Sequence, residues 1–278
     1  MSSILTNNSA MTALQTLQSI NKNLESTQSR ISSGLQISSG KDNAAYFSIS
    51  ETMKGDSSMY KAIDEGLTLQ KNSVATARLG AETVQEVASL FAERVAFAQG
   101  GTDEVRADIQ NELDELVARI NTSISQATFN GTSLVEGTAT VTVVTGISRS
   151  AAGSISTTSI TFMQQDLGAI ASTLGAIDLT TASTTALMET ALQDAEAQLD
   201  AAIVSATALG IAEKSIETQK EFLGALTDTL DSGVGSMVDA DMEEEAARLQ
   251  SLQVQQQLAT QSLSIANQSP QNILSLFQ

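Results

Sequence analysis

A seven-residue repeat of apolar residues between Tyr46 and Ala98 constrains the fold more than any other feature of this sequence. The repeat forms two parallel lines, and fourteen of their sixteen positions are apolar or Tyr. One line contains Tyr46, Met53, Tyr60, Leu67, Val74, Ala81, Ala88 and Val95, and the other contains Ile49, Asp56, Ile63, Gln70, Ala77, Val84, Phe91 and Ala98. Such a sustained repeat predicts one long helix that packs sideways against other helices.

Two further segments carry matching apolar stripes. Gly100 and Gly101 predict the end of the long helix, and Thr102 predicts the N-cap of the next one. The apolar residues of this second helix are Val105, Ile109, Leu113, Leu116, Ile120 and Ile124. A later stripe keeps seven-residue spacing through Ala195, Ala202, Leu209, Ile216, Leu223 and Leu230. The three stripes predict helices that cover one another.

The composition excludes most catalytic chemistry. The 278 residues include no Cys and no His, so a thiolate nucleophile, a His-based triad and a Cys/His zinc site are impossible. The chain also lacks a P-loop, an HExxH and a GxSxG motif. We therefore expect no enzyme, no catalytic residue, no cofactor and no metal, and we interpret Glu243–Glu245 as the acidic first turn of a helix.

Charge and hydropathy limit the partners. The net charge of −18 argues against nucleic acid and anionic membranes, which both attract basic surfaces. No apolar run is long enough to span a bilayer. The N-terminal residues lack the basic and apolar regions of a secretory signal, so we expect any export to proceed without a cleaved signal peptide.

Both ends of the chain are uncharged. The first charged side chain is Lys22, and none follows Arg248. The two ends nevertheless keep an apolar period, which favours buried helices over the alternative of frayed tails. The predicted N-terminal seam comprises Ala10, Ala13, Leu17, Ile20, Leu24, Thr27 and Ile31, and the C-terminal apolar residues are Leu249, Leu252, Val254, Leu258, Ala259, Leu263, Ile265 and Ala266.

The segment from Thr138 to Phe162 differs in kind. It alternates β-branched and polar residues around a turn at Ser148–Gly153, which predicts a β-hairpin. An isolated hairpin is marginal in water, so we expect it to lean on the helices. The predicted fold class is mainly α, with long antiparallel coiled-coil helices, paired N- and C-terminal helices and a small β-hairpin insert.

Three motifs resemble the bacterial flagellins. "RISSGLQISSGKDNAA" at Arg30–Ala45 is similar to the flagellin N-terminal signature, and "SLSIANQSPQNILSLFQ" at Ser262–Gln278 is similar to the C-terminal one. "ATFNGTSL" at Ala127–Leu134 resembles the turn that follows the second long helix in this family. The resemblance implies a subunit of the flagellar filament.

The resemblance also implies a domain layout. Residues 1–44 and 236–278 correspond to the two halves of the inner helical domain that lines the filament channel. Residues 45–137 and 186–235 correspond to the halves of the surrounding helical shell, and residues 138–185 to a short, variable, solvent-facing insert. The implied localisation is extracellular. The implied partners are further copies of the chain, the filament cap, hook–filament junction proteins and a C-terminal export chaperone of the type III apparatus.

Individual contact residues are predicted from the seams and the motif. Arg30, Lys41 and Asp42 match charged motif positions and are expected to pair within or between subunits, with ordinary solvated charge as the alternative. The predicted packing or polymer-contact residues are Leu17, Ile20, Leu24, Ile31, Leu35, Leu252, Leu258, Leu263, Ile265, Leu276 and Phe277. The segment Val84–Gln99 lacks the motif that the vertebrate innate flagellin receptor reads, so we predict weak or no recognition.

Two alternatives remain at this point. A hook–filament junction protein of the same superfamily shares the N-terminal signature, although the C-terminal motif argues against it. A secreted coiled-coil adhesin or effector explains the heptads but not the two matched uncharged ends.

Overall fold

The computed structural model describes residues 7–150, 154–181 and 184–275. The chain divides into two compact units. The terminal unit consists of residues 1–57 and 228–278, and the central unit consists of residues 58–227. Helices α2 (Ala44–Ala98) and α5 (Thr185–Val238) contribute residues to both units.

The core of the central unit lies where the predicted stripes meet. From Leu67 onwards, every apolar position of the two heptad lines in α2 is buried. Ile109, Leu113, Ile120 and Ile124 of α3 (Asp103–Gln126) are buried in the same core, as is the α5 stripe from Ala195 to Leu223. The predicted long helices and their mutual cover are therefore confirmed.

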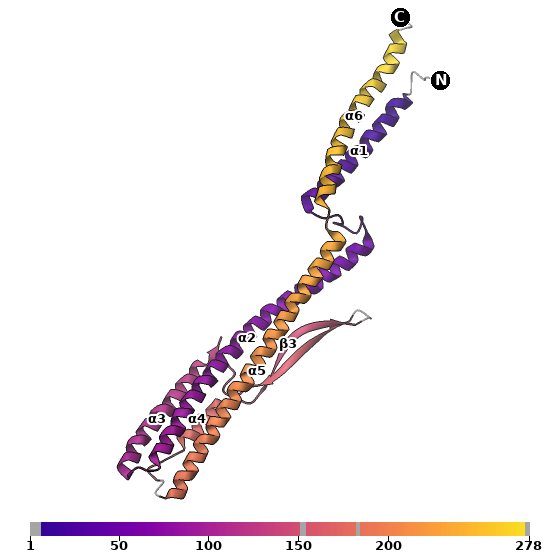
Figure 1. Cartoon of the computed structure of the whole chain (residues 1–278). Coiled ribbons are helices and arrows are strands. Elements are labelled where there is room, and N and C mark those ends of the chain that lie inside the picture. Colours follow the sequence, from indigo (N-terminus) through magenta and orange to yellow (C-terminus); the bar gives the residue numbers. More distant parts are fainter. Residues whose placement is uncertain (1–6, 151–153, 182–183, 276–278) are drawn as a thin grey trace. The chain divides into compact units, whose positions relative to one another are not determined.

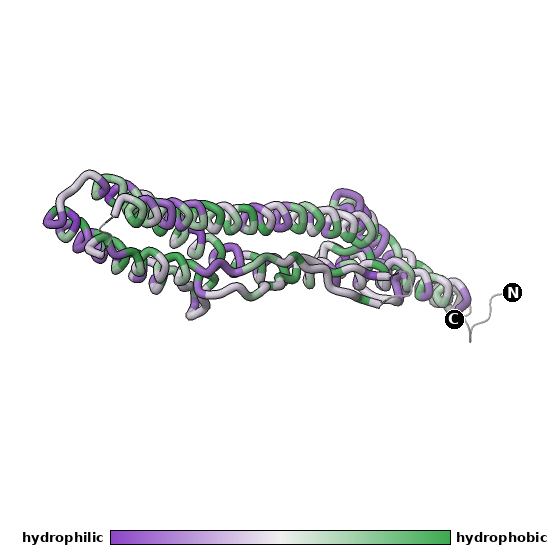
Figure 2. The backbone as a smooth tube through the Cα atoms, turned by 90° about the horizontal axis from the view of Figure 1, so that it is seen from below, coloured by the Kyte–Doolittle hydropathy of each residue, from purple (hydrophilic) through white to green (hydrophobic). Residues whose placement is uncertain are grey.

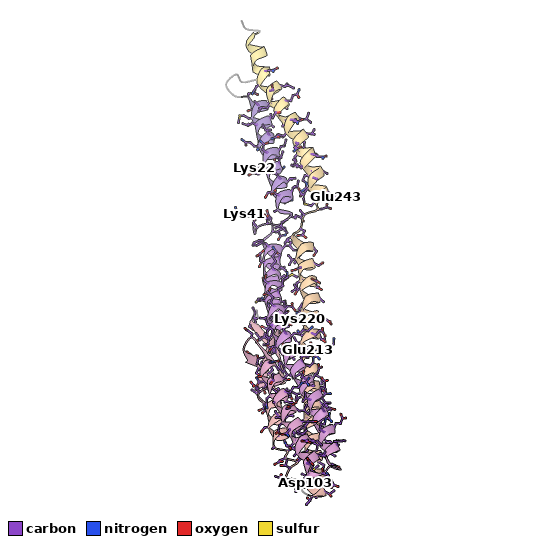
Figure 3. The ribbon with its side chains drawn as sticks, turned by 90° about the vertical axis from the view of Figure 1, so that its left-hand side faces the viewer. Lys22, Lys41, Asp103, Glu213, Lys220 and Glu243 are labelled. Carbon is purple, nitrogen blue, oxygen red and sulfur yellow. The ribbon has the colours of Figure 1, made fainter. Side chains whose placement is uncertain are left out.

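Ion pairs between α2 and α5 lie along this antiparallel packing. Arg78 Nε lies 2.7 Å from Glu213 Oε2, and Lys71 Nζ lies 2.9 Å from Glu217 Oε1. Lys220, two turns after Glu213 on α5 (Figure 3), lies 3.8 Å from Asp64 Oδ2. Polar residues at the margin of an apolar seam fix which residues of the two helices stand opposite each other.

The predicted hairpin is present and packs on helices. Strand β3 (Thr140–Arg149) pairs antiparallel with β4 (Ile155–Met163), with a register shift between Val144 and Gly146. Tyr60 Oη of α2 donates a hydrogen bond to Ile147 O at 3.1 Å, and Gln219 Nε2 of α5 donates one to Thr145 O at 2.9 Å. Strand β4 is mostly exposed, so β3 provides the attachment.

Two smaller elements complete the central unit. Strands β1 (Thr128–Phe129) and β2 (Thr132–Ser133) are joined by Asn130 and Gly131, whose φ values of 51° and 76° suit a tight hairpin turn. Helix α4 (Leu167–Gly175) was not predicted, because its nine residues are too few for a clear apolar period. Its start has a local signal, since Asp166 caps Ala169 N at 3.0 Å.

The terminal unit contains α1 (Asn8–Ser33) and α6 (Met242–Ser275), which lie side by side and run antiparallel (Figure 1). The residues of α2 and α5 in this unit also meet, since Ser57 Oγ donates a hydrogen bond to Asp231 Oδ1 at 2.7 Å. Tyr46 and Ile49, the first positions of the two heptad lines, are about half exposed at 49% and 50%. The predicted pairing of the terminal helices is thus confirmed. The first positions of the two apolar lines in α2, however, remain partly exposed.

Hydropathy alternates along the long helices, and Figure 2 shows no extended apolar run in them. Within the described ranges, no helix is both long enough and apolar enough to cross a membrane.

Candidate assembly surface

The terminal helix pair joins through a narrow seam that is uncharged except at its Arg30–Glu245 end. On α1 the predicted seam residues are the half-buried or buried ones, and they include Leu17, Ile20, Leu24 and Ile31. On α6 the corresponding residues are Leu249, Leu252, Gln256, Ala259, Leu263 and Ala266. The two rows each repeat every seven residues, so α1 and α6 meet as an antiparallel coiled coil.

Other predicted contact residues lie outside this seam. Val254, Leu258 and Ile265 form a stripe on α6, here called the outer stripe, and they are 55%, 62% and 64% exposed. Met11 and Leu14 of α1 are similarly exposed. These exposed apolar side chains make the outer stripe a candidate contact surface. Leu276 and Phe277 lie outside the described residues.

An open groove runs beside the seam. Its volume is about 700 Å³, and its apolar walls are Ala13 and Ile20 of α1 and Leu258 and Ala259 of α6. Hydroxyl and amide side chains provide the remaining walls, among them Thr12, Thr16 and Gln255. The groove is therefore neutral throughout, and it suits an apolar or uncharged helix rather than a charged ligand.

Three polar contacts connect α1 with α6 at different heights. Arg30 Nη1 lies 3.1 Å from Glu245 Oε1, and Gln256 Nε2 donates a hydrogen bond to Asn21 Oδ1 at 2.7 Å. Asn7 Nδ2, from the residue that caps α1, donates a hydrogen bond to Ala266 O at 2.8 Å. The residue numbers rise on α1 as they fall on α6, so all three contacts belong to one antiparallel register.

Glu245 is the buried member of a small charge cluster. Its side chain is 6% exposed, and its Oε1 atom accepts hydrogen bonds from Arg30 Nη1 and from Arg248 Nη1 at 3.0 Å. Within the described part of the chain, the buried Oε2 atom has no hydrogen-bond partner. Arg248 also pairs with Glu244 at 2.8 Å on the same helix. In this cluster Arg30 makes an ion pair within its own chain.

Backbone hydrogen bonds connect the two polar joints of the terminal unit. Val238 O accepts from Gln36 N at 2.7 Å and from Ile37 N at 3.3 Å, while Ala240 N donates to Gly34 O at 2.9 Å. Gly34 ends α1 with a φ of 73°, a conformation that favours glycine. The half-buried Leu35 forms an isolated β-bridge with Asp239. The Ser/Gly-rich segment is therefore an ordered connection.

Asp42 organises that segment from within. Its Oδ2 atom accepts hydrogen bonds from the backbone N–H groups of Ser38 and Ser39 at 3.1 and 3.0 Å, and also from both hydroxyls. The backbone bond from Ser38, followed by that from Ser39, lowers the pKa of Asp42. Lys41 is exposed, and among the described residues it makes no ion pair. Asp42 thus acts within its own loop.

The acidic start of α6 is a capped helix end. Asp241 Oδ1 accepts hydrogen bonds from Glu243 N at 3.0 Å and Glu244 N at 3.2 Å. Figure 3 shows Glu243 in the first turn of α6, and it shows Lys22 on the neighbouring helix α1. The described residues contain no group of three or more acidic side chains arranged to hold a metal ion.

Three contact residues were not predicted from the sequence, namely Asn21, Gln256 and Glu245. A signal was available for two of them, since the seven-residue line through Leu252 and Ala259 extends back to Glu245, and the line through Leu249 and Leu263 includes Gln256. Polar residues at such seam positions are informative because they are uncommon there.

Comparisons with known proteins agree with the sequence motifs. Residues 4–140 match the bacterial flagellin N-terminal helical region, and residues 190–277 match the bacterial flagellin C-terminal helical region. A flagellin of Brucella melitensis biotype 1 is 43% identical over 282 residues, with full coverage of both chains. Flagellin FljM of Caulobacter vibrioides is 34% identical and covers 100% of this chain and 99% of its own.

A solved structure supports the fold alone. The structure of a putative flagellar hook-associated protein from Vibrio parahaemolyticus has a TM-score of 0.51 and 14% sequence identity. It covers 72% of this chain and 99% of its own.

Proposed function

The chain belongs to the bacterial flagellin family, and on this premise we propose that its terminal helices complete their folding as each subunit joins the filament. Flagellins are structural, non-enzymatic subunits that self-polymerise into the flagellar filament, an extracellular appendage. The full-length similarity to chains named flagellin disfavours the hook–filament junction alternative and the unrelated adhesin.

One observation carries the proposal. The outer stripe and the neutral groove leave large apolar side chains of the terminal unit exposed in a single chain. Burying one Leu or Ile side chain contributes about 1.5–3 kcal/mol, so stacked copies that cover the stripe gain several such terms. A helix with cover on only one side has little tertiary support of its own. Folding and association of the ends therefore stabilise each other.

We propose the following layout of the chain in the filament. Residues 1–44 and 236–278 form the inner layer of the filament, residues 45–137 and 186–235 form the shell, and residues 138–185 face solvent. A contact that repeats with a rotation that does not close produces a helical fibre rather than a ring.

Seeded growth tests the proposal. Purified chain with and without short filament fragments is examined by electron microscopy, beside a version that lacks Leu249–Gln278. We expect the full-length chain to grow filaments from the seeds and the truncated chain to stay monomeric. If the truncated chain grows at the same rate as the full-length chain, the contacts that stabilise the filament lie outside Leu249–Gln278. Addition of a single terminal layer by the full-length chain favours a junction role.

Hydrogen exchange tests the coupling itself. In the monomer we expect α1 and α6 to exchange rapidly while the core of α2, α3 and α5 stays protected, and in the filament we expect all helices to be protected. Equal protection of α1 and α6 in both states contradicts coupled folding.

We further propose that the chain leaves the cell unfolded through the flagellar type III apparatus without a cleaved signal peptide. A C-terminal chaperone, the filament cap and hook–filament junction proteins are the proposed partners. The uncharged ends support this, since their amide and hydroxyl side chains are soluble while unpaired and cost less to bury than charged side chains. Copurification of a chaperone with the full-length chain, and its loss with the truncated one, is the expected result.

We also propose weak or no recognition by the vertebrate innate flagellin receptor. Val84–Gln99 places Glu86, Glu93 and Arg94 among apolar residues without the charged and amide sequence that the receptor reads. A cell-reporter assay with matched amounts of depolymerised chain and of a recognised flagellin checks this. Equal potency of the two proteins contradicts it.

A further inference from the structure

The seam between α1 and α6 is repetitive. Its apolar residues recur every seven positions on both helices, and none of the residues beyond Arg248 on α6 is charged. A shift of one helix along the other by one heptad moves it by about 10 Å and again brings apolar residues against apolar residues. The connection of residues 34–43 is long enough to follow such a shift when extended, but the shift breaks its backbone hydrogen bonds to Val238 and Ala240. Apolar packing by itself therefore selects this register only weakly.

The charged contact in the seam does not repeat. Arg30 and Glu245 are opposite each other in the observed register, and a shift by one heptad in either direction places neither opposite another charge on the facing helix. The Asn21–Gln256 hydrogen bond is less specific. Asn21 meets Leu249 or Leu263 in the shifted registers, but one of the two shifts places Gln28 opposite Gln256. These two side-chain contacts, together with the backbone bonds of residues 34–37 to Val238 and Ala240, distinguish the observed register from its nearest competitors.

Glu245 has a burial that stability alone does not explain. Removing a carboxylate from water is costly, and here one of its two oxygens remains without a described partner. A Leu at this position continues the apolar line through Leu252 without that cost. A buried polar residue in a helical seam is best known as a device that fixes register and excludes other pairings.

We propose that Arg30 and Glu245 set the register in which α1 and α6 pair, with Asn21 and Gln256 as the second determinant. The inference rests on the proposed function, since the pair must choose its register while it folds during assembly. A subunit in a shifted register displaces the outer stripe of α6 relative to α1, so it presents the wrong surface to the next copy. Arg30 and Glu245 are in this sense positioning residues for polymerisation.

Cysteine cross-linking measures the register directly, because the chain contains no native Cys. The variant N7C/A266C reports the observed register, and N7C/A259C reports a shift by one heptad, and both keep Asn21 and Gln256. Each cysteine pair is made in the wild-type background, in E245Q, in R30E and in the double reversal R30E/E245R. The proteins are grown on wild-type seeds, and a short bifunctional maleimide is then added to cross-link the two cysteines. The reversal E51K/K54E of an exposed pair on α2 is the matched control.

We expect E245Q and R30E to lower the ratio of in-register to shifted product at least about tenfold, and R30E/E245R to restore it. The E51K/K54E control should leave the ratio unchanged. An unchanged ratio in E245Q and R30E overturns the proposal. If R30E does not assemble, the double reversal decides, because restored filaments support the proposal and absent filaments overturn it.

The same cysteine variants also test, separately, the proposed coupling between folding of the terminal helices and assembly. Rapid N7C/A266C cross-linking in the free monomer with native Arg30 and Glu245 shows that the ends fold before assembly, which contradicts the proposed function. The dependence of the ratio on Arg30 and Glu245 still reports whether this pair sets the register.

Discussion

Gly80 of α2 lies so close to Ala127, the residue that follows α3, that no side-chain carbon fits on Gly80 without moving its neighbour. Both residues are buried in the central unit. The missing side chain at Gly80 is thus what allows the end of α3 to pack against α2.

The substitution G80A is therefore expected to destabilise the central unit by roughly 1–3 kcal/mol, because overpacking forces the backbone at Ala127 to shift. Gly66 supplies the control, since it is an exposed position of the same helix with nothing near an added Cβ. There, G66A should stabilise by about 0.5–1 kcal/mol through helix propensity. Thermal unfolding of both monomers checks the opposite signs, and a loss of stability in both variants contradicts the packing argument.

Glu217 gives a pH prediction. Its hydrogen bonds with Lys214 and then Lys71 lower its pKa from 4.5 to about 2. A lowered pKa in the folded state means that its contribution to stability is present above pH 4.5 and is lost as the pH falls toward 2. The difference in urea midpoint between wild type and E217Q should therefore be largest at neutral pH and shrink as the pH falls through this window. The effect is small because the site is solvent-exposed.

The control for Glu217 is E189Q. Glu189 is exposed on the same helix, and the described residues offer it no ion pair. Its midpoint difference should stay close to zero from neutral pH to pH 2. A constant gap between wild type and E217Q over the same range contradicts the assigned ion pairs.

The outer stripe gives an assembly prediction. Leu258 and Ile265 are exposed in the single chain, so L258Q and I265Q should leave monomer stability almost unchanged. If neighbouring copies cover them, each substitution should raise the monomer concentration needed for seeded growth about tenfold or more. The control L258I keeps the apolar character and volume and should remain near wild type. Sedimentation of filaments across monomer concentrations measures this, and unchanged growth of both Gln variants excludes the stripe as a contact.

The sequence predicted most of this fold because long apolar periods determine which face of a helix is buried. Leu67 to Ala98 of α2 and the α5 stripe follow that rule closely. Helix α4 was not predicted, because a segment of nine residues between turns contains too few repeats of the apolar pattern. The hairpin was predicted from its alternation, whereas its attachment through Tyr60 and Gln219 depends on residues far apart in the chain.

The candidate surface was predicted less completely. The seam residues of α1 follow from spacing, but the partner of Arg30 was missed. Glu245 is one of three consecutive glutamates, and in the sequence only its place on the seven-residue line through Leu252 and Ala259 distinguishes it. Leu258 and Ile265 share their apolar character with Leu252 and Leu263, and only the three-dimensional pairing separates the outer stripe from the inner seam.

Asp42 gives a prediction for the joint in the assembled filament. D42A removes the acceptor of the Ser38 and Ser39 amides, so the peptide containing these serines should exchange hydrogen about tenfold faster or more, whereas D42N keeps an acceptor oxygen and should fall between the two. The lowered pKa of Asp42 means that its contribution persists above pH 3.8 and is lost as the pH falls below that value. Hydrogen-exchange mass spectrometry of dissociated, quenched filaments measures this. Identical exchange in wild type and D42A means that the backbone bonds to Val238 hold the joint without Asp42.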